Sequence, residues 1–300
     1  MFVANANKLI TLVIPVYSPT LSDLDLFSLK YSIQVLCKKH DISFICPQSL
    51  DINFYSTLFP NAKFIAFDDC YFYSVSNYSQ LLLSESFYKK FESYEFILIT
   101  QTDAIILRDE LDFWCSQKYD YIGAPWPNAL SIVVNTDQYK GQNKRVRCSV
   151  GNGGLSLRRV KKLIELLKEF PEAAGNLANA GINEDLFFSA FGSLSGDFSI
   201  PDRITASKFS MEISVEYFYH LNGGYAPMGG HAWWRYHAKF WLDLLGSYAD
   251  TIRESALKAH AVELTKINAI ENSTAESRAK WAIAELTKMK EVENQHEIND

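Results

Sequence analysis

The chain has 300 residues, and 48% of them are apolar or aromatic, so it is long enough to bury a sizeable core. Its net charge is −6 and it shows no dense basic stripe, which leaves non-specific nucleic-acid binding without an electrostatic source. We therefore expect a globular protein that does not bind nucleic acid.

The five cysteines lie scattered without a Cys-x-x-Cys pair, which argues against both a disulfide framework and a structural zinc site. The apolar run Leu9–Val16 is too short to span a membrane. We expect no transmembrane segment and a cytoplasmic protein, with peripheral attachment to a membrane as an alternative.

The first hundred residues alternate short apolar runs with helical patterns. Alternation of this kind predicts an α/β fold with a mainly parallel sheet covered on both faces. Ligands bind beyond the carboxyl ends of the strands in such sheets, so the residues that follow each apolar run are candidate site residues. The pattern predicts strands at Leu9–Val16, Ile42–Ile45, Lys63–Phe67 and Phe96–Thr100, and helices at Leu24–Lys38, Asp51–Phe59 and Tyr78–Phe91.

The pattern loosens after another apolar run, Tyr119–Gly123. The polar stretch Asn128–Arg147 has few periodic apolar positions and is predicted to form a mobile loop. Leu155–Leu157 then leads into a predicted helix, Arg158–Phe170, which Pro171 ends.

The C-terminal part is rich in Ala, Glu and Lys from about Ala249 and is predicted to be helical. We expect one domain over residues 1–247 and a helical extension or linker over residues 248–300. The extension is interpreted as a linker, as a helix through which the protein forms a homo-oligomer, or as a partly disordered end.

The stretch with the clearest chemistry is Gln101-Thr102-Asp103, which follows the predicted strand Phe96–Thr100 directly. A carboxylate at the carboxyl end of a strand is placed to hold a divalent cation through oxygen ligands. Asp103 is the candidate metal ligand, although an Asp that caps a turn between two strands explains the same spacing.

A second stretch, Gly151-Asn-Gly-Gly154, lets a ligand approach the backbone closely. It is neither a Walker loop nor a Gly-x-Gly-x-x-Gly motif. We interpret Asn152, Gly153 and Gly154 as the floor of a binding site, with a tight turn before the next helix as the alternative.

Two acids, Glu184 and Asp185, follow Asn183 in a predicted first helical turn, where the helix dipole alone would favour negative charge. A carboxylate in a closed site also serves as a general base. We predict that Asp185 is the general base and that Glu184 orients the acceptor whose hydroxyl Asp185 deprotonates.

The cluster Ala226–Arg235 combines glycines with His231, Trp233, Trp234 and Arg235. His231 is a candidate second metal ligand, because imidazole suits manganese-like ions. Trp233 could cover a sugar ring, as could Trp126 after Gly123-Ala-Pro. A hydrogen-bonded structural histidine and core tryptophans are the alternatives.

The order of these motifs resembles the DUF5672-type glycosyltransferase-like family, which is grouped with the nucleotide-diphospho-sugar transferases. The resemblance covers most of residues 8 to 245. It is carried by Asn77, Gln101-Thr102-Asp103, Asp109-Glu110-Leu111, Tyr119–Trp126, Gly151–Gly154, Asn183-Glu184-Asp185 and Pro227–His231.

The resemblance implies a glycosyltransferase of the A type, with a Rossmann-like half that binds the donor and an Asp-x-Asp element that holds Mn²⁺ or Mg²⁺. Here Gln101 replaces the first acid, so the ion would be held by Asp103, His231, the donor phosphates and water, or be dispensable. The expected donor-binding residues are Pro15, Tyr17, Asn77, Tyr78, Gln101, Thr102 and Asp103, and the expected acceptor-binding residues are Trp126, Asn152, Gly153, Gly154 and Trp233.

The implied reaction transfers a sugar from a nucleotide-sugar donor to a glycan or glycolipid acceptor, in the manner of surface glycan synthesis. The Glu184-Asp185 pair resembles that of inverting enzymes, so we expect inversion with Asp185 as base. A retaining transferase and a carbohydrate-binding protein with a decayed site are the alternatives. The sequence identifies neither the nucleotide nor the sugar.

Overall fold

The computed structural model describes residues 8–36, 39–269 and 274 of the chain. The strands are β1 (Lys8–Pro15), β2 (Asp41–Pro47), β3 (Lys63–Phe67), β4 (Tyr94–Thr100), β5 (Ile105–Ile106), β6 (Tyr121–Ile122), β7 (Pro125–Val134), β8 (Lys144–Val150), β9 (Leu155–Arg159), β10 (Ser210–Met211) and β11 (Gly229–Gly230). The α-helices are α1 (Asp23–Leu36), α2 (Asn53–Leu58), α3 (Val75–Leu82), α4 (Glu85–Lys89), α5 (Leu111–Ser116), α6 (Val160–Glu169), α7 (Pro171–Asn179), α8 (Glu184–Gly192), α9 (Arg203–Phe209), α10 (Val215–Leu221), α11 (Trp233–Tyr236) and α12 (Ala238–Leu245).

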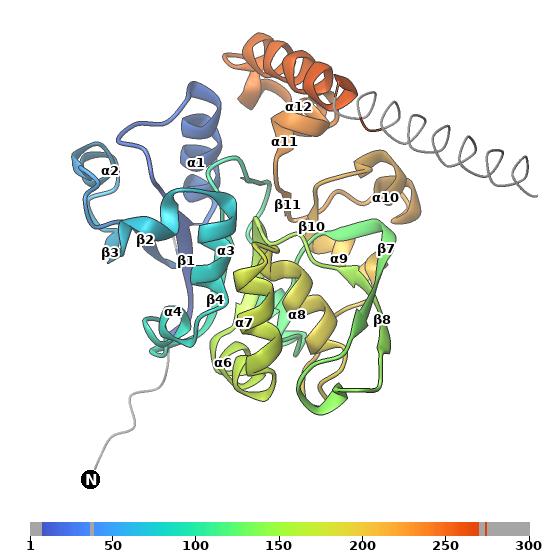
Figure 1. The fold of residues 1–300 in the computed structure, drawn as a ribbon. Coiled ribbons are helices and arrows are strands. Elements are labelled where there is room, and N and C mark those ends of the chain that lie inside the picture. The colour runs from blue at the N-terminus through green and yellow to red at the C-terminus, as the bar shows by residue number, and fades with distance from the viewer. Residues whose placement is uncertain (1–7, 37–38, 270–273, 275–300) are drawn as a thin grey trace, which may run out of the picture.

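A six-stranded central sheet has the order β3-β2-β1-β4-β9-β6. Strands β1 to β4 run parallel, and β9 is antiparallel to both of its neighbours. The predicted α/β class with a mainly parallel sheet is therefore confirmed (Figure 1).

Helices cover both faces of this sheet, which explains why its strands are apolar on both sides. Alternate residues of β1 belong to different cores: Val13 packs with residues of α4, α6 and α8, and Leu12 packs with residues of α1 and α5. The last six residues of β1 are all buried. The strand pattern in the sequence is a direct consequence of this two-sided burial.

The order of the strands reverses at β1, since β2 and β4 flank it and the chain crosses over between them. Such a reversal opens a crevice at the carboxyl ends of the two neighbouring strands. Tyr17 follows β1 there, and Gln101, Thr102 and Asp103 follow β4. The topology therefore brings two of the predicted motifs to one point.

A smaller three-stranded sheet, β10-β11-β5, extends from this crevice and connects the segment after β4 to the C-terminal third of the chain. The two residues of β11 immediately precede His231. A third hydrophobic cluster joins β5, α10, α11 and α12, and it also contains Ile252 and Ala256. The start of the helix over residues 253–269 is thus packed against the folded body.

Three expectations about local structure were wrong. The predicted helix Tyr78–Phe91 is two helices, α3 and α4, because Ser84 caps the second with its side chain. The predicted loop Asn128–Arg147 lies in the hairpin of β7 and β8 (Figure 1), whose buried Val146 and Cys148 supply an apolar inner face.

The third concerns the predicted helix Arg158–Phe170. Arg158 lies in β9 and the helix α6 begins only at Val160. Pro171 does end that helix, but it also occupies the first position of α7, where its fixed φ fits a helix start.

Within the described ranges, no helix combines the length and the apolar character that crossing a bilayer requires. The predicted helical extension lies largely in residues outside the described part, so its proposed role in oligomerisation stays a prediction.

Candidate active site

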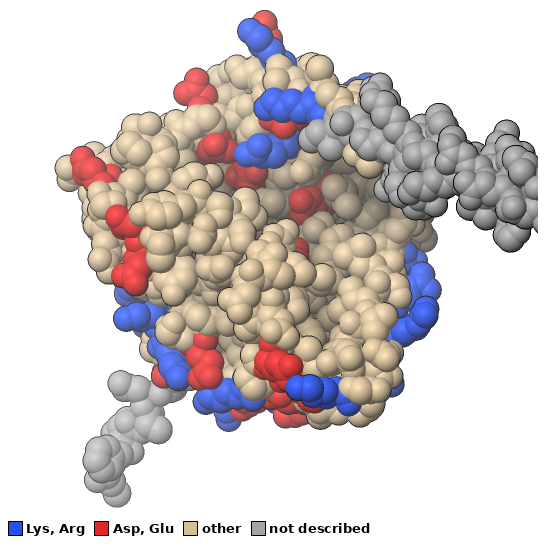
Figure 2. All heavy atoms as spheres, in the orientation of Figure 1, with Lys and Arg blue, Asp and Glu red and all other residues tan. Residues whose placement is uncertain are grey.

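A cavity of about 630 Å³ opens at the crevice between β1 and β4. Figure 2 shows it as a hollow on this face of the molecule, with acidic side chains inside. Its wall brings together residues from the β1 end, the β4 end, the glycine-rich loop, the start of α8 and the segment after β11. The predicted residues on the wall are Pro15, Tyr17, Tyr78, Gln101, Thr102, Asp103, Asn152, Gly153, Gly154, Glu184, Asp185 and His231.

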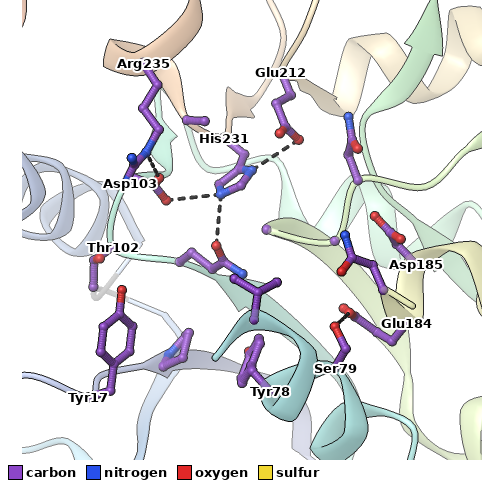
Figure 3. A pocket seen from close by; sticks show the side chains of 18 of the residues that line it. Tyr17, Tyr78, Ser79, Thr102, Asp103, Glu184, Asp185, Glu212, His231 and Arg235 are labelled. Carbon is purple, nitrogen blue, oxygen red and sulfur yellow. Dashed lines mark hydrogen bonds and ion pairs between the residues drawn. The ribbon is translucent and has the colours of Figure 1, made fainter. Parts of the chain in front are cut away.

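One end of the cavity is built around Asp103 (Figure 3). Its Oδ2 accepts a hydrogen bond from Arg235 Nε at 2.8 Å, and its Oδ1 lies 3.1 Å from His231 Nε2. Burial alone would raise the pKa of this carboxyl, but His231 and Arg235 together lower it far below its ordinary value. Asp103 is therefore ionised at neutral pH.

His231 lies between acceptors on both sides of its ring. Nε2 is also 3.0 Å from Gln101 Oε1, and Nδ1 is 3.1 Å from Glu212 Oε2. Burial would lower the pKa of His231, but the charges of Glu212 and Asp103 raise it well above its usual value. The contact with Glu212 has an ion-pair distance without hydrogen-bond geometry, so Nδ1 has no hydrogen-bond partner among the described residues.

The loop Gly151-Asn-Gly-Gly154 connects the other parts of the site. A Cβ on Gly154 would overlap the ring of His231, and a Cβ on Gly153 would lie 2.7 Å from Glu184 Oε1. Neither glycine has a positive φ, so they are needed for close approach rather than for a turn. Asn152 accepts a hydrogen bond from Trp126 Nε1 at 2.8 Å.

Asp185 lies at the other end of the cavity, in the first turn of α8 (Figure 3). Burial and then the charge of neighbouring Glu184 raise its pKa to about 7. No ion-pair partner of Asp185 is found in the described part of the chain. A carboxylate with this pKa is suited to accept a proton near neutral pH.

Glu184 points away from this role. Its Oε1 accepts from Arg158 Nη2 at 2.8 Å, and its Oε2 accepts from Ser79 Oγ at 3.0 Å. Both of its oxygens are therefore engaged inside the protein, which does not favour the predicted contact with an acceptor.

Three residues of the cavity wall contain a buried polar atom without a partner. Tyr78 OH, Asn152 Nδ2 and Asp25 Oδ1 have no hydrogen-bond partner among the described residues. Buried groups of this kind gain most from a partner that supplies hydroxyl or amide groups. These three atoms could be reached by a ligand only after a local movement of their side chains.

The residues around Asp103 fit a divalent cation in part. Neighbouring ligands of an octahedral ion, each about 2.1 Å from the metal, lie about 3.0 Å apart. The separations of His231 Nε2 from Asp103 Oδ1 and from Gln101 Oε1, 3.1 and 3.0 Å, are ion-pair and hydrogen-bond distances that are also compatible with this spacing. No group of three or more His, Cys, Asp and Glu side chains in the described ranges could hold a metal ion, so the remaining ligands would come from a substrate and water.

Three predicted site residues lie elsewhere. Trp233 is fully buried in the third cluster and donates to Ser28 Oγ on α1, so it cannot contact an acceptor. Trp126 lies behind the glycine-rich loop rather than on the cavity wall. Asn77 accepts from Ser74 Oγ at the start of α3 and is not on the wall either. Their apolar or capping surroundings, the alternatives in the sequence, explain these positions.

Several residues of the site were missed. Glu212 and Asp25 are single acids without a motif. Arg158 gave one usable signal, since it directly follows the apolar run Leu155–Leu157 at a position where the structure buries it completely. A buried arginine requires an acidic partner, and Glu184 is that partner.

A family model described as "Protein of unknown function (DUF5672)" matches residues 61–231, more than half of the chain. The chain belongs to this family. The matched segment of this DUF5672 protein runs from the start of β3 to His231, and it includes Asp103, the glycine-rich loop and Asp185. The family expected from the sequence is confirmed. A comparison with curated proteins gives no match.

Solved structures with a similar arrangement carry glycosyltransferase names. The galactosyltransferase LgtC with donor and acceptor sugar analogues has 14% identity and a TM-score of 0.45, covering 79% of this chain and 95% of that one. Mouse xyloside xylosyltransferase 1 has 12% identity and a TM-score of 0.44, covering 74% and 97%. The bifunctional WbbM has 10% identity and a TM-score of 0.47, covering 85% and 52%. Because each TM-score is below 0.5, the function proposed below rests on this chain's own residues.

Proposed function

We propose that this DUF5672 protein transfers a sugar from a nucleotide-sugar donor to a hydroxyl of a glycan or glycolipid acceptor, with inversion at the anomeric carbon. One observation carries the proposal. One end of the cavity holds side-chain oxygen and nitrogen atoms of Asp103, His231 and Gln101 that are candidate metal ligands. The other end of the same cavity holds Asp185, whose pKa is about 7. Leaving-group stabilisation and proton removal are the two tasks of such a transfer.

The charges of the cavity support a divalent cation at the first end. Five acids line the wall, and its two cations, His231 and Arg235, are already paired with Asp103. A diphosphate brings further negative charge, which needs a counter-charge that this wall does not offer. Asp103, and His231 once its ring has lost a proton, would hold Mn²⁺ or Mg²⁺, which would neutralise the charge that develops on the departing diphosphate.

Asp185 would act on the acceptor. Its carboxylate takes the proton of the attacking hydroxyl while that oxygen bonds to the anomeric carbon. The bond from this carbon to the diphosphate oxygen breaks, and the diphosphate leaves with the electron pair. Because Asp185 is ionised above pH 7, transfer should rise with pH through about 7.

The proposal is tested with a panel of nucleotide sugars, first by thermal stability with Mn²⁺ and then by transfer or hydrolysis of the donors that bind. We expect at least one donor to raise the melting temperature and to be turned over, because a ligand that binds only the native state stabilises it. Proton NMR of the product should show inverted anomeric configuration.

Two results would change the proposal in different ways. Retained configuration would remove the role of Asp185 as base and leave it to position the acceptor. Absence of any donor binding, with or without Mn²⁺, would contradict sugar transfer altogether.

A further inference from the structure

Arg158 is a buried cation that no ligand can reach. Its side chain has no exposed surface, and Nε, Nη1 and Nη2 donate to Ser156 Oγ, Tyr88 OH and Glu184 Oε1 at 3.0, 3.0 and 2.8 Å. The rings of Tyr121 and Phe188 lie 5.5 and 5.4 Å from the guanidinium carbon. Arg158 is therefore fixed in place as a permanent positive charge behind the cavity wall.

Glu184 balances this charge and is held as tightly. Arg158 and Ser79 bind its two oxygens, and Gly153 lies so close that a Cβ there would be 2.7 Å from Oε1 and 2.8 Å from Arg158 Nη2. Residues of α3, the glycine-rich loop and β9 thus meet on one carboxylate of α8. Such an arrangement is more than the helix start of α8 needs, since capping alone would be met by an exposed acid.

We propose that Glu184 is a positioning residue for Asp185: it fixes the first turn of α8 against β9 and cancels the charge of Arg158, which would otherwise weaken Asp185 as a base. The inference rests on the proposed function, in which Asp185 removes the acceptor proton. It assigns Glu184 a role through its neighbour and no contact with substrate.

The groups around Asp185 come from four elements: Glu184 on α8, Arg158 on β9, Tyr121 on β6 and Glu212 after β10. Burial is the largest cause that raises the pKa of Asp185, and Glu184 is the next; the amide of Leu186 and the charge of Arg158 oppose them. Without the charge of Glu184, only burial and the charge of Glu212 would oppose the lowering effects of Arg158 and the Leu186 amide on Asp185. Its pKa would then fall.

The test is a carbon NMR titration of the full chain labelled at the aspartate carboxyl carbons, with Asp185→Asn to assign the signal. We expect a midpoint near 7 in the unaltered protein. In Glu184→Gln the midpoint should be lower by about one unit or more, because the positive charge of Arg158 is no longer compensated. The double variant Glu184→Gln/Arg158→Met removes both charges and should recover a raised midpoint. Ser79→Ala keeps both charges and should leave the midpoint within about half a unit.

Two results would overturn the inference: a Glu184→Gln midpoint equal to that of the unaltered protein, or a double variant whose midpoint stays as low as that of Glu184→Gln. If Glu184→Gln does not fold, the double variant decides, because replacing a buried ion pair by uncharged side chains is often tolerated. A midpoint of the double variant in the ordinary aspartate range would then contradict the proposal.

Transfer assays on the same variants separate this inference from the proposed function. If Glu184 sets the pKa of Asp185 in the active protein, the acidic limb of the pH–rate profile of Glu184→Gln moves to lower pH. The size of this shift equals that of the NMR midpoint. A merely structural role of Glu184 would lower the rate without moving that limb. If the NMR midpoints shift as expected but the protein transfers no sugar, the role of Glu184 toward Asp185 would be supported. The proposed sugar transfer would then be contradicted.

Discussion

The two ends of the cavity hold the same side chain in opposite environments. At one end His231 and Arg235 surround Asp103 and lower the pKa of its carboxyl. At the other end burial and Glu184 raise the pKa of Asp185 to about 7. The lesson is that the surroundings and not the residue type set the role: Asp103 is a permanent anion for a cation, and Asp185 is a base that can exchange protons near neutral pH.

The difference also separates the two acids that are adjacent in the sequence. Glu184 lies beside a fixed arginine and has both oxygens bonded, whereas Asp185 faces the cavity without an ion-pair partner among the described residues (Figure 3). The first turn of α8 therefore directs the carboxylate of Glu184 into the protein and that of Asp185 toward the cavity.

The largest effect is expected from Asp185→Asn, which removes the base. We expect the transfer rate to fall about 10³-fold or more, within the range that general base catalysis contributes. Asp197→Asn is the matched control, because Asp197 is exposed and its ion-pair partner within the described ranges is Lys162 on the surface. Steady-state kinetics of both variants on the selected donor make the measurement, and similar rates for the two would contradict the role of Asp185.

Asp103→Asn should reduce transfer about 10²-fold, because one charged ligand of the cation is lost. Raising the Mn²⁺ concentration should restore part of this rate, since the loss is partly one of metal affinity. Raising the Mn²⁺ concentration should not restore the transfer rate of Asp185→Asn. Equal responses of the two variants to Mn²⁺ would remove the distinction between the ends of the cavity.

The two variants should shift stability in opposite directions. The folded-state pKa of Asp185 is raised, so stability falls as pH rises from about 4 toward 7, and Asp185→Asn should melt about 3 °C higher at pH 8 and higher by clearly less at pH 5. The folded-state pKa of Asp103 is lowered, so its stabilisation is present at neutral pH and is lost as pH falls below about 4. Asp103→Asn should therefore melt lower at pH 8, and calorimetric scans at the two pH values check both signs.

The smallest effect concerns the glycine that covers the Arg158–Glu184 pair. Gly153→Ala should destabilise the protein by about 1–3 kcal/mol, because the added methyl overlaps two buried, immobile side chains. Gly175→Ala is the control, since that glycine lies in α7 with no atom within 4 Å of an added Cβ and should be neutral or stabilising. Denaturant unfolding of the two variants measures the difference, and equal stabilities would show that Gly153 is not tightly packed.

Much of the fold could be predicted from the sequence because a parallel sheet covered on both faces leaves a strong local pattern. The predicted strand Lys63–Phe67 has the observed bounds of β3, and the predicted strand Leu9–Val16 differs from β1 by one residue at each end. The hairpin of β7 and β8 could not be recognised, because exposed Leu130 and Val133 and a register shift after Pro125 break the alternation of buried and exposed residues in β7.

The site could be predicted where function places residues at the ends of strands and helices, as for Asp103, Asp185 and the glycine-rich loop. It could not be predicted where a role depends on long-range partners. Trp233 has the same composition signal as a sugar-binding aromatic, and only its contact with Ser28 across the fold shows that it is structural. Glu212 becomes part of the site only because β10 pairs with β11 beside His231.

A crystal structure of the protein with Mn²⁺ and the nucleotide sugar that the donor panel selects would test the division of the cavity most directly. We expect the cation to contact Asp103 and His231, with the diphosphate on it, and the anomeric carbon to lie between the diphosphate and Asp185. A nucleotide sugar bound away from Asp103, or with its anomeric carbon turned away from Asp185, would contradict the account.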